Sequence, residues 1–311
     1  MEFDDRDRAD ESEVEDRRGM RFPGGGVGMG VGGLGLVGGV IYFAIQIWAS
    51  SGSPTGAAVS RLIEESQRGV ETGGSQPRGS QTQLTGSCRG VTSESDPAKF
   101  VVCVETNVQA FWRRQLASAS GTTASGGGYR PAKLVLFSEA TRSGCGTASA
   151  ATGPFYCPED QRVYLDLGFF EELQRRFHAR GGDFAEAYVV AHEYGHRVQD
   201  QLGTMARVQR AEEEHPGERG PLSVRLELQA DCYAGVWGHA AYADGKVSRA
   251  EIAEALDAAA AIGDDRIQKQ ATGRVNPETF THGSSAARQR WFSIGMESGD
   301  PAACATFHEG G

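Results

Sequence analysis

The 311-residue sequence has few basic side chains. Lys and Arg number 31 against 41 Asp and Glu, which gives a formal net charge of -10. No basic stripe is present that could neutralise a run of phosphates, and this argues against a nucleic-acid partner. Charged residues make up 23% of the chain and hydrophobic residues 39%. That balance is typical of a water-soluble domain and not of a membrane protein with many spans.

Two further absences narrow the class of protein. The 43 glycines follow no Gly-X-Y period, which excludes a collagen triple helix. The six cysteines include no Cys-x2-Cys pair, which argues against a zinc ribbon. All six follow residue 49, and an even number is typical of disulfides in an extracytoplasmic domain. Sequence does not decide the pairing, but Cys145 with Cys157 is the best local expectation because it would clip one loop between two strands.

The first 49 residues divide into an acidic part and an apolar part. Residues 1–23 carry nine acids and five arginines with few large apolar side chains, so we predict a disordered cytoplasmic tail. Residues 24–49 contain an uncharged run from Val27 to Trp48 that is long enough to cross a bilayer as a helix. Arginines precede this run and the next base is Arg61, which predicts a single-pass anchor with the N-terminus cytoplasmic and the remainder extracytoplasmic. A cleaved signal peptide is the alternative, although the acidic tail argues against it.

The rest of the chain divides into a linker and one domain. Residues 50–87 are rich in Ser, Gly, Thr and Gln and are predicted to form a flexible tether. Residues 88–311 are predicted to form one α+β domain, mainly helical with a small sheet. Short bulky runs at Lys133–Phe137 and Arg162–Asp166 predict strands. Helices are expected at about 97–116, 183–202, 223–243, 248–262 and 284–295.

The strongest motif is His192-Glu193-Tyr194-Gly195-His196, an H-E-x-x-H pattern. On a helix, the two histidines project from one face and can share a tetrahedral cation. Glu193 lies beside them, where its carboxylate can reach a metal-bound water, as a general base must. Apolar residues recur at helical spacing through the surrounding segment, which is typical of a packed helix.

A catalytic zinc site needs a third protein ligand and an open position for water. Gln199 and Leu202 stand where the extended metzincin motif requires Gly and His, so that subclass is excluded. A later helix supplies Glu227 and Asp231 in an E-x-x-x-D pattern. We predict that Glu227 is the third ligand and that Asp231 accepts the free ring N–H of His192. The reverse assignment, with Asp231 as the ligand, fits the same spacing.

Several segments together resemble the bacterial neutral zinc metallopeptidases. They are Gly153–Pro158, Val163–Asp166, His192–His196, Glu227–Trp237 and Thr281–Ser285. The resemblance covers about Cys88 to Cys304 and includes the N-terminal anchor. It implies a membrane-anchored, zincin-like domain in which the two histidines and the Glu of E-x-x-x-D hold Zn2+.

The predicted activity is zinc-dependent hydrolysis of peptide bonds, with a peptide or protein as substrate and the lipid bilayer as a second partner through the N-terminal helix. Glu193 would take a proton from zinc-activated water and pass it to the leaving amine. A transition-state oxyanion needs a donor besides zinc, and His282 is the candidate, with Tyr194 a weaker one. The alternative function is a zinc-stabilised envelope binding module without turnover.

Overall fold

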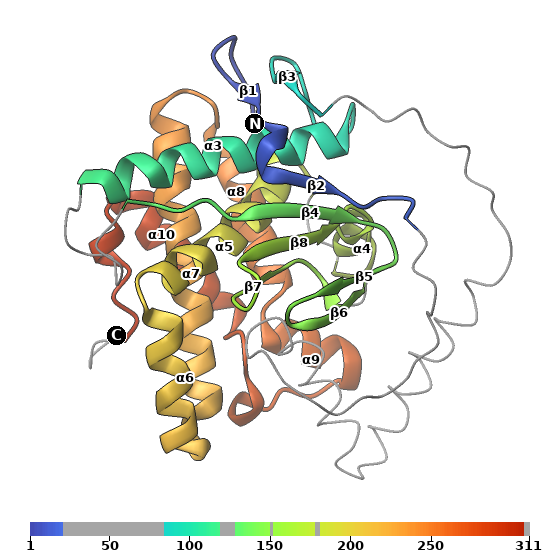
Figure 1. Cartoon of the computed structure of the whole chain (residues 1–311). Coiled ribbons are helices and arrows are strands. Elements are labelled where there is room, and N and C mark those ends of the chain that lie inside the picture. Colours follow the sequence, from blue (N-terminus) through green and yellow to red (C-terminus); the bar gives the residue numbers. More distant parts are fainter. Residues whose placement is uncertain (21–83, 119–127, 150–151, 178–180, 308–311) are drawn as a thin grey trace, which may run out of the picture.

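The computed structural model describes residues 1–20, 84–118, 128–149, 152–177 and 181–307 (Figure 1). The predicted α+β class with a mainly helical composition is confirmed, because long helices pack beside small sheets. The predicted membrane crossing at residues 24–49 lies outside the described residues, as does most of the predicted tether. Within the described part of the chain, no helix is both long and apolar enough to cross a membrane.

The main sheet has four strands in the order β2-β4-β8-β7. They are β2 (Val14–Asp16), β4 (Lys133–Phe137), β8 (Arg162–Asp166) and β7 (Phe155–Cys157). Strand β4 pairs in parallel with both β2 and β8, and β7 pairs antiparallel with β8. The two predicted strands are therefore confirmed. Strand β4 is a continuous apolar run because Leu134 and Leu136 enter one hydrophobic cluster, while Val135 and Phe137 enter another on the opposite face.

Disulfides join segments at three places. Cys145 lies in the turn of a hairpin, β5 (Ala140–Ser143) with β6 (Gly146–Ser149), and bonds Cys157 at the end of β7, as predicted. The other two pairs are Cys88–Cys103 and Cys232–Cys304. All six cysteines are thus bonded.

The helices account for most of the remaining structure. Their bounds are α3 (Pro97–Ser118), α4 (Gly168–Phe177), α5 (Asp183–Gln201), α6 (Thr204–Glu214), α7 (Arg219–Ala243), α8 (Arg249–Ala261), α9 (Asp264–Thr272) and α10 (Ser285–Ser298). Helix α5 is buried along most of its length and packs against α3, α7 and α8. It ends as predicted before Gly203, whose φ of 73° is a left-handed conformation suited to glycine.

Helix α5 starts at the expected residue, whereas helix α7 starts earlier than expected. The N-cap of α5 is Gly182, and the carboxylate of Asp183 accepts hydrogen bonds from the backbone N–H and hydroxyl of Ser93. Helix α7 begins four residues before Ser223, whose hydroxyl donates to the carbonyl of Thr281. In both places a side chain near the expected helix start bonds to a distant segment of the chain.

Helices α7 and α10 cross in close backbone contact. A Cβ atom on Gly235 would lie 2.1 Å from the carbonyl oxygen of Phe292, and one on Gly295 would lie 2.0 Å from that of Cys232. Only glycine fits at these positions. This crossing sets the position of α10 against the helix that carries Glu227 and Asp231.

The prediction of a disordered tail over residues 1–23 is wrong for residues 1–20. These residues form β1 (Arg8–Ala9), a 3-10 turn (Glu11–Glu13) and β2, and they lie beside α3 and β4 in Figure 1. Strand β1 pairs with β3 (Gly86–Ser87), so the end of the predicted tether is also part of the fold. Met1, Phe3 and Ala9 are buried, although Met20 at the end of the segment is exposed, and many of the charged side chains have partners on the domain.

Candidate metal centre

Helix α5 places the H-E-x-x-H residues on its buried face. His192, Glu193 and His196 are 6%, 7% and 3% exposed. The two imidazole rings lie with centroids 4.8 Å apart and nearly perpendicular planes. Because α5 is a regular helix, the four-residue spacing brings both rings to the same side, as the motif predicts.

Glu227 completes a cluster that can hold a metal ion. Its two carboxylate oxygens lie 3.3 Å from Nε2 of His192 and 3.4 Å from Nε2 of His196. Two ligands that are each about 2.1 Å from a tetrahedral ion are about 3.4 Å apart. Ligand atoms of His192, His196 and Glu227 all lie within 4.8 Å of one another. The donor set and its spacing therefore fit zinc.

Asp231 lies on the other side of the His192 ring. Its Oδ1 is 2.9 Å from Nδ1 of His192 and accepts a 2.5 Å hydrogen bond from the hydroxyl of Tyr188. This arrangement matches the predicted orienting role and leaves Nε2 of His192 facing Glu227. It favours Glu227, and not Asp231, as the third ligand.

Arg288 on α10 pairs with Asp231 through two parallel contacts. Nε lies 2.8 Å from Oδ2, and Nη2 lies 2.8 Å from Oδ1. Both side chains are buried, so the pair is well shielded from solvent. The Arg288 guanidinium and the His192 ring outweigh burial, and the pKa of the Asp231 carboxyl is lowered. Arg288 therefore keeps the carboxylate charged where it meets His192.

His196 has its own orienting partner on the same helix. Its Nδ1 lies 2.8 Å from Oε1 of Gln199. The Gln199 amide nitrogen donates to the carbonyl of Leu226 and to Oε1 of Gln229 on α7. The amide of Gln199 therefore fixes the His196 ring and also ties α5 to α7.

The loop before α10 holds His282 in a buried position against Asp264. Oδ2 of Asp264 accepts the backbone N–H groups of Thr281, His282 and Gly283, at 2.7, 2.6 and 2.9 Å. Oδ1 of the same carboxylate lies 3.2 Å from Nδ1 of His282. Burial lowers the pKa of His282, but Asp264 and Glu227 outweigh it and the pKa is raised. One carboxylate thus shapes the loop and orients the imidazole.

The electrostatics of the centre favour a divalent cation. Glu193, Glu227 and Asp231 are three buried carboxylates, and Arg288 is a buried guanidinium. Burial lowers the pKa of His192, but Asp231 and Glu227 outweigh it and raise that pKa to about 10, so a proton on the ring balances part of this negative charge before a metal binds. A divalent cation would replace that proton as the counter-charge. Burial also raises the pKa of Glu193, which makes that carboxylate a better proton acceptor.

Gly195 allows the second helix to approach the first. A Cβ atom at this position would lie 3.0 Å from the carbonyl oxygen of Ala230 and 3.2 Å from its Cα. Glycine therefore lets α7 lie close enough to α5 for Glu227 to reach both histidines. Tyr194 points elsewhere, because its hydroxyl is 3.4 Å from the carbonyl oxygen of Ala132. Of the two predicted oxyanion donors, His282 is the one that interacts electrostatically with Glu227 of the cluster.

Sequence reasoning missed three orienting residues. Gln199 follows His196 by three residues and could have been found from that helical spacing. Arg288 lies 57 residues beyond Asp231, and Asp264 lies 18 residues before His282. No spacing rule connects such pairs, since their meeting depends on how the helices pack.

The comparisons with known proteins agree with this geometry. The model of the family described as Putative neutral zinc metallopeptidase matches residues 1–307. "Uncharacterized protein YpfJ" of Escherichia coli (strain K12) is 44% identical over 229 residues, which cover 73% of this chain and 77% of the relative. "Uncharacterized protein Rv2575" of Mycobacterium tuberculosis (strain ATCC 25618 / H37Rv) is 46% identical over 228 residues, 68% of this chain and 73% of the relative. No solved structure matches. A match over nearly the whole chain, around a cluster suited to zinc, shows that the protein belongs to this family of zinc metallopeptidases.

Proposed function

We propose that the protein hydrolyses peptide bonds with zinc held by His192, His196 and Glu227. The observation that supports this most strongly is the buried His2Glu cluster with the Glu193 carboxylate beside it. Three protein ligands leave a fourth position for water, which is the arrangement of catalytic and not structural zinc sites. Zinc, when bound there, activates water and polarises a carbonyl oxygen.

The protein's own residues then move the proton and position the groups. Glu193 accepts a proton from the attacking water and passes it to the leaving amine. Asp231 and Gln199 hold the two histidine rings through Nδ1, so each Nε2 stays directed at the cluster. His282, oriented by Asp264, donates a hydrogen bond to the oxyanion that develops on the substrate carbonyl.

We also propose that the metal centre works outside the cytoplasm. Three disulfides among the described residues support an oxidising compartment, because such bonds are rare in the cytosol. Attachment to a membrane through residues 24–49 stays a prediction from the sequence.

The test uses the purified full chain loaded with zinc. Glu193→Gln should retain zinc and lose cleavage of a peptide library by about 10²- to 10⁴-fold, because the proton acceptor is removed. His282→Ala should lower kcat by about 10²- to 10³-fold with zinc content unchanged. Zinc is measured by elemental analysis and cleavage by mass spectrometry. Glu214→Gln, at an exposed position on α6, is the matched control and should change neither.

The alternative, a zinc-stabilised binding module, makes a different prediction. The wild-type chain would then bind zinc and cleave no peptide of the library, with or without a chelator. Cleavage by Glu193→Gln at the wild-type rate would instead exclude Glu193 as the base.

A further inference from the structure

The N-terminal segment, residues 1–20, packs against the metallopeptidase domain although the sequence predicts it on the opposite side of a membrane. Figure 1 shows it lying over α3 and along the edge of β4. The family model also includes these residues in its match. This segment and the domain are separated in sequence by residues 21–83, which include the predicted crossing.

Backbone hydrogen bonds join the segment to the domain at separate places. Strand β2 continues the main sheet, and beyond it the Arg17 N–H donates to the carbonyl of Leu136 at 2.7 Å. Strand β1 pairs antiparallel with β3. The Glu2 N–H donates to the carbonyl of Lys246 at 2.7 Å. Contacts at a strand, a sheet edge and a loop after α7 fix the whole segment and not only one end.

Apolar side chains of the segment enter the main core. Met1, Phe3 and Ala9 are 4%, 6% and 7% exposed and belong to the same hydrophobic cluster as the central helices. The Phe3 ring meets Phe100 of α3 edge to face, with centroids 5.9 Å apart. Without the segment, Phe100 and its neighbours on α3 would lose apolar partners, which is unfavourable in water.

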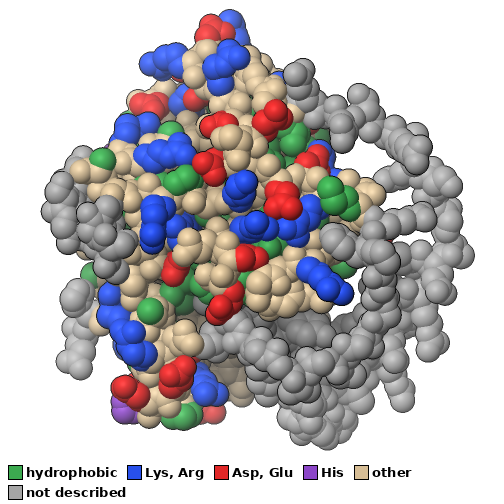
Figure 2. All heavy atoms as spheres, in the orientation of Figure 1, with side chains coloured by type: hydrophobic (Ala, Val, Ile, Leu, Met, Phe, Trp, Pro, Cys, Tyr) green, Lys and Arg blue, Asp and Glu red, His purple; other side chains and the backbone are tan. Residues whose placement is uncertain are grey.

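Charged side chains of the segment match charges on the domain. Glu15 pairs with Arg162 of β8 at 3.2 Å, and Lys246 contacts both Asp4 and Asp7. Arg17 donates to the hydroxyl of Thr141 at 3.0 Å and to the carbonyl of Arg142 at 2.8 Å. Figure 2 shows acidic and basic side chains interspersed over this face. Acidic side chains of the segment, whose number predicted disorder, therefore make specific contacts with the domain.

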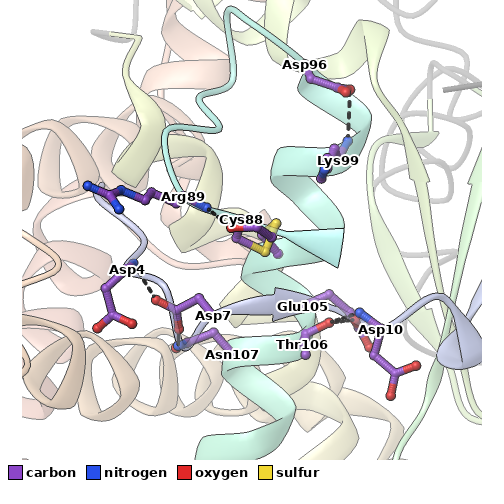
Figure 3. The surroundings of a disulfide bond; sticks show 12 residues. Asp4, Asp7, Asp10, Cys88, Arg89, Asp96, Lys99, Glu105, Thr106 and Asn107 are labelled. Atoms are coloured by element: carbon purple, nitrogen blue, oxygen red, sulfur yellow. Dashed lines mark hydrogen bonds between the residues drawn. A yellow bond between two sulfur atoms is a disulfide. The ribbon is translucent and has the colours of Figure 1, made fainter. Parts of the chain in front are cut away.

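The segment also contacts the first disulfide. The Cys88 N–H donates to the carbonyl of Asp7 at 3.0 Å, and Cys88 is bonded to Cys103 of α3. Figure 3 shows Asp4, Asp7 and Asp10 beside this disulfide. Cys88–Cys103 forms in an oxidising compartment, so a segment that packs on it must be in that compartment too.

We infer that residues 1–20 are a permanent part of the metallopeptidase fold and lie on the same side of the membrane as the metal centre. A single crossing by residues 24–49 would place residues 1–20 and the metallopeptidase domain on opposite sides of the membrane. None of these contacts could then form. The packed segment and a cytoplasmic N-terminus therefore exclude each other. This inference does not depend on peptidase activity.

A designed disulfide tests the packing in the full chain. Arg8 and Ser87 are exposed and are directly opposite each other in the β1–β3 pair. Opposite residues in antiparallel strands have Cα atoms about 4.5 to 5.5 Å apart, within the range that a disulfide bridges. Arg8→Cys/Ser87→Cys should form an intramolecular bond in isolated membranes, detected as a linked peptide by mass spectrometry.

The matched control is Arg8→Cys/Arg210→Cys. Arg210 is exposed on α6, at the far end of the molecule from β1 in Figure 1, and no bond should form. If the two thiols introduced at Arg8 and Ser87 formed no link, or linked only one chain to another, the inference would be overturned.

Labelling of single introduced cysteines gives a second measurement. It reports the side of the membrane on which each thiol lies and does not require a designed disulfide to form. Arg8→Cys and Arg210→Cys are each treated in sealed vesicles with a membrane-impermeant thiol reagent. The inference expects the thiols of both variants to react from the same side. Reaction of the two variants from opposite sides would overturn the inference and support the predicted cytoplasmic N-terminus.

Discussion

Around the metal centre, charged side chains are buried and paired with one another, whereas the N-terminal segment carries many of its charges at the surface. The Arg288 and Asp231 side chains are 2% and 0% exposed. The Arg89 and Asp5 side chains, which also pair across distant parts of the chain, are 68% and 77% exposed. The two pairs have similar distances, 2.8 and 3.0 Å, so contact length alone does not distinguish them.

This difference in burial predicts which single substitutions will lower the stability of the fold. A buried charge that loses its partner remains in a dry site, while an exposed charge that loses its partner is solvated by water. Burial of the group left behind should therefore decide the cost. The following predictions test that statement from the largest effect to the smallest.

Replacement of Arg288 should have the largest effect. Arg288→Met leaves Asp231 buried without its cation and should lower the free energy of unfolding by about 3 to 5 kcal/mol. It should also weaken zinc binding by about 10- to 100-fold, because Asp231 orients His192. Denaturant titration and zinc competition measure the two effects.

Arg290→Met is the matched control, since Arg290 is exposed on the same helix. Its unfolding midpoint should stay close to that of the wild type. Equal losses in the two variants would mean that the burial of Asp231 contributes nothing, and the comparison would fail.

Glu105 on α3 should produce an effect that depends on pH. Burial raises the pKa of its carboxyl to about 8, above the ordinary value near 4.5. The folded chain therefore binds a proton that the unfolded chain releases between these values, and stability falls as pH rises from about 4.5 to 8. The slope is at most about 1.4 kcal/mol per pH unit.

Glu105→Gln keeps a neutral side chain of the same shape and should remove this part of the pH dependence. Unfolding free energies between pH 5 and 8, roughly the window between the two pKa values, measure it. Glu94→Gln, at an exposed position, should retain the wild-type slope. An unchanged slope in Glu105→Gln would show that the carboxyl is not protonated in the folded state.

The Arg89–Asp5 pair should contribute least. Arg89→Ala should lower the free energy of unfolding by less than about 1 kcal/mol, because both partners are exposed. Phe3→Ala, in the same region, removes a buried ring and should cost about 3 to 5 kcal/mol. If Arg89→Ala were the more damaging of the two, charge pairing and not apolar burial would hold the N-terminal segment in place.

The sequence predicts the centre of the site better than its surroundings. His192, Glu193 and His196 lie in one helix, so their spacing alone brings them together. Glu227 could be inferred because its motif is local to a second helix. Arg288 and Asp264 could not, since their partners meet them only after α7, α9 and α10 have packed.

The same limit explains the error at the N-terminus. Composition alone favours disorder for residues 1–20, because it counts apolar residues without showing that Met1, Phe3 and Ala9 can be buried. The partners of Phe3 and Glu15 lie 97 and 147 residues further along the chain, at Phe100 and Arg162. By contrast, the strands at 133–137 and 162–166 are short, largely apolar runs whose local pattern is sufficient.

The glycine in the middle of the H-E-x-x-H motif has a consequence for protein engineering. Gly195 faces the backbone of Ala230 with 3.0 Å available for a Cβ atom. Transplanting this zinc site onto a designed pair of helices would need more than two histidines and a glutamate at the correct spacing. The first helix would also need glycine where the second helix crosses it, because a larger residue would push the second helix, and the third ligand with it, away by a few tenths of an ångström.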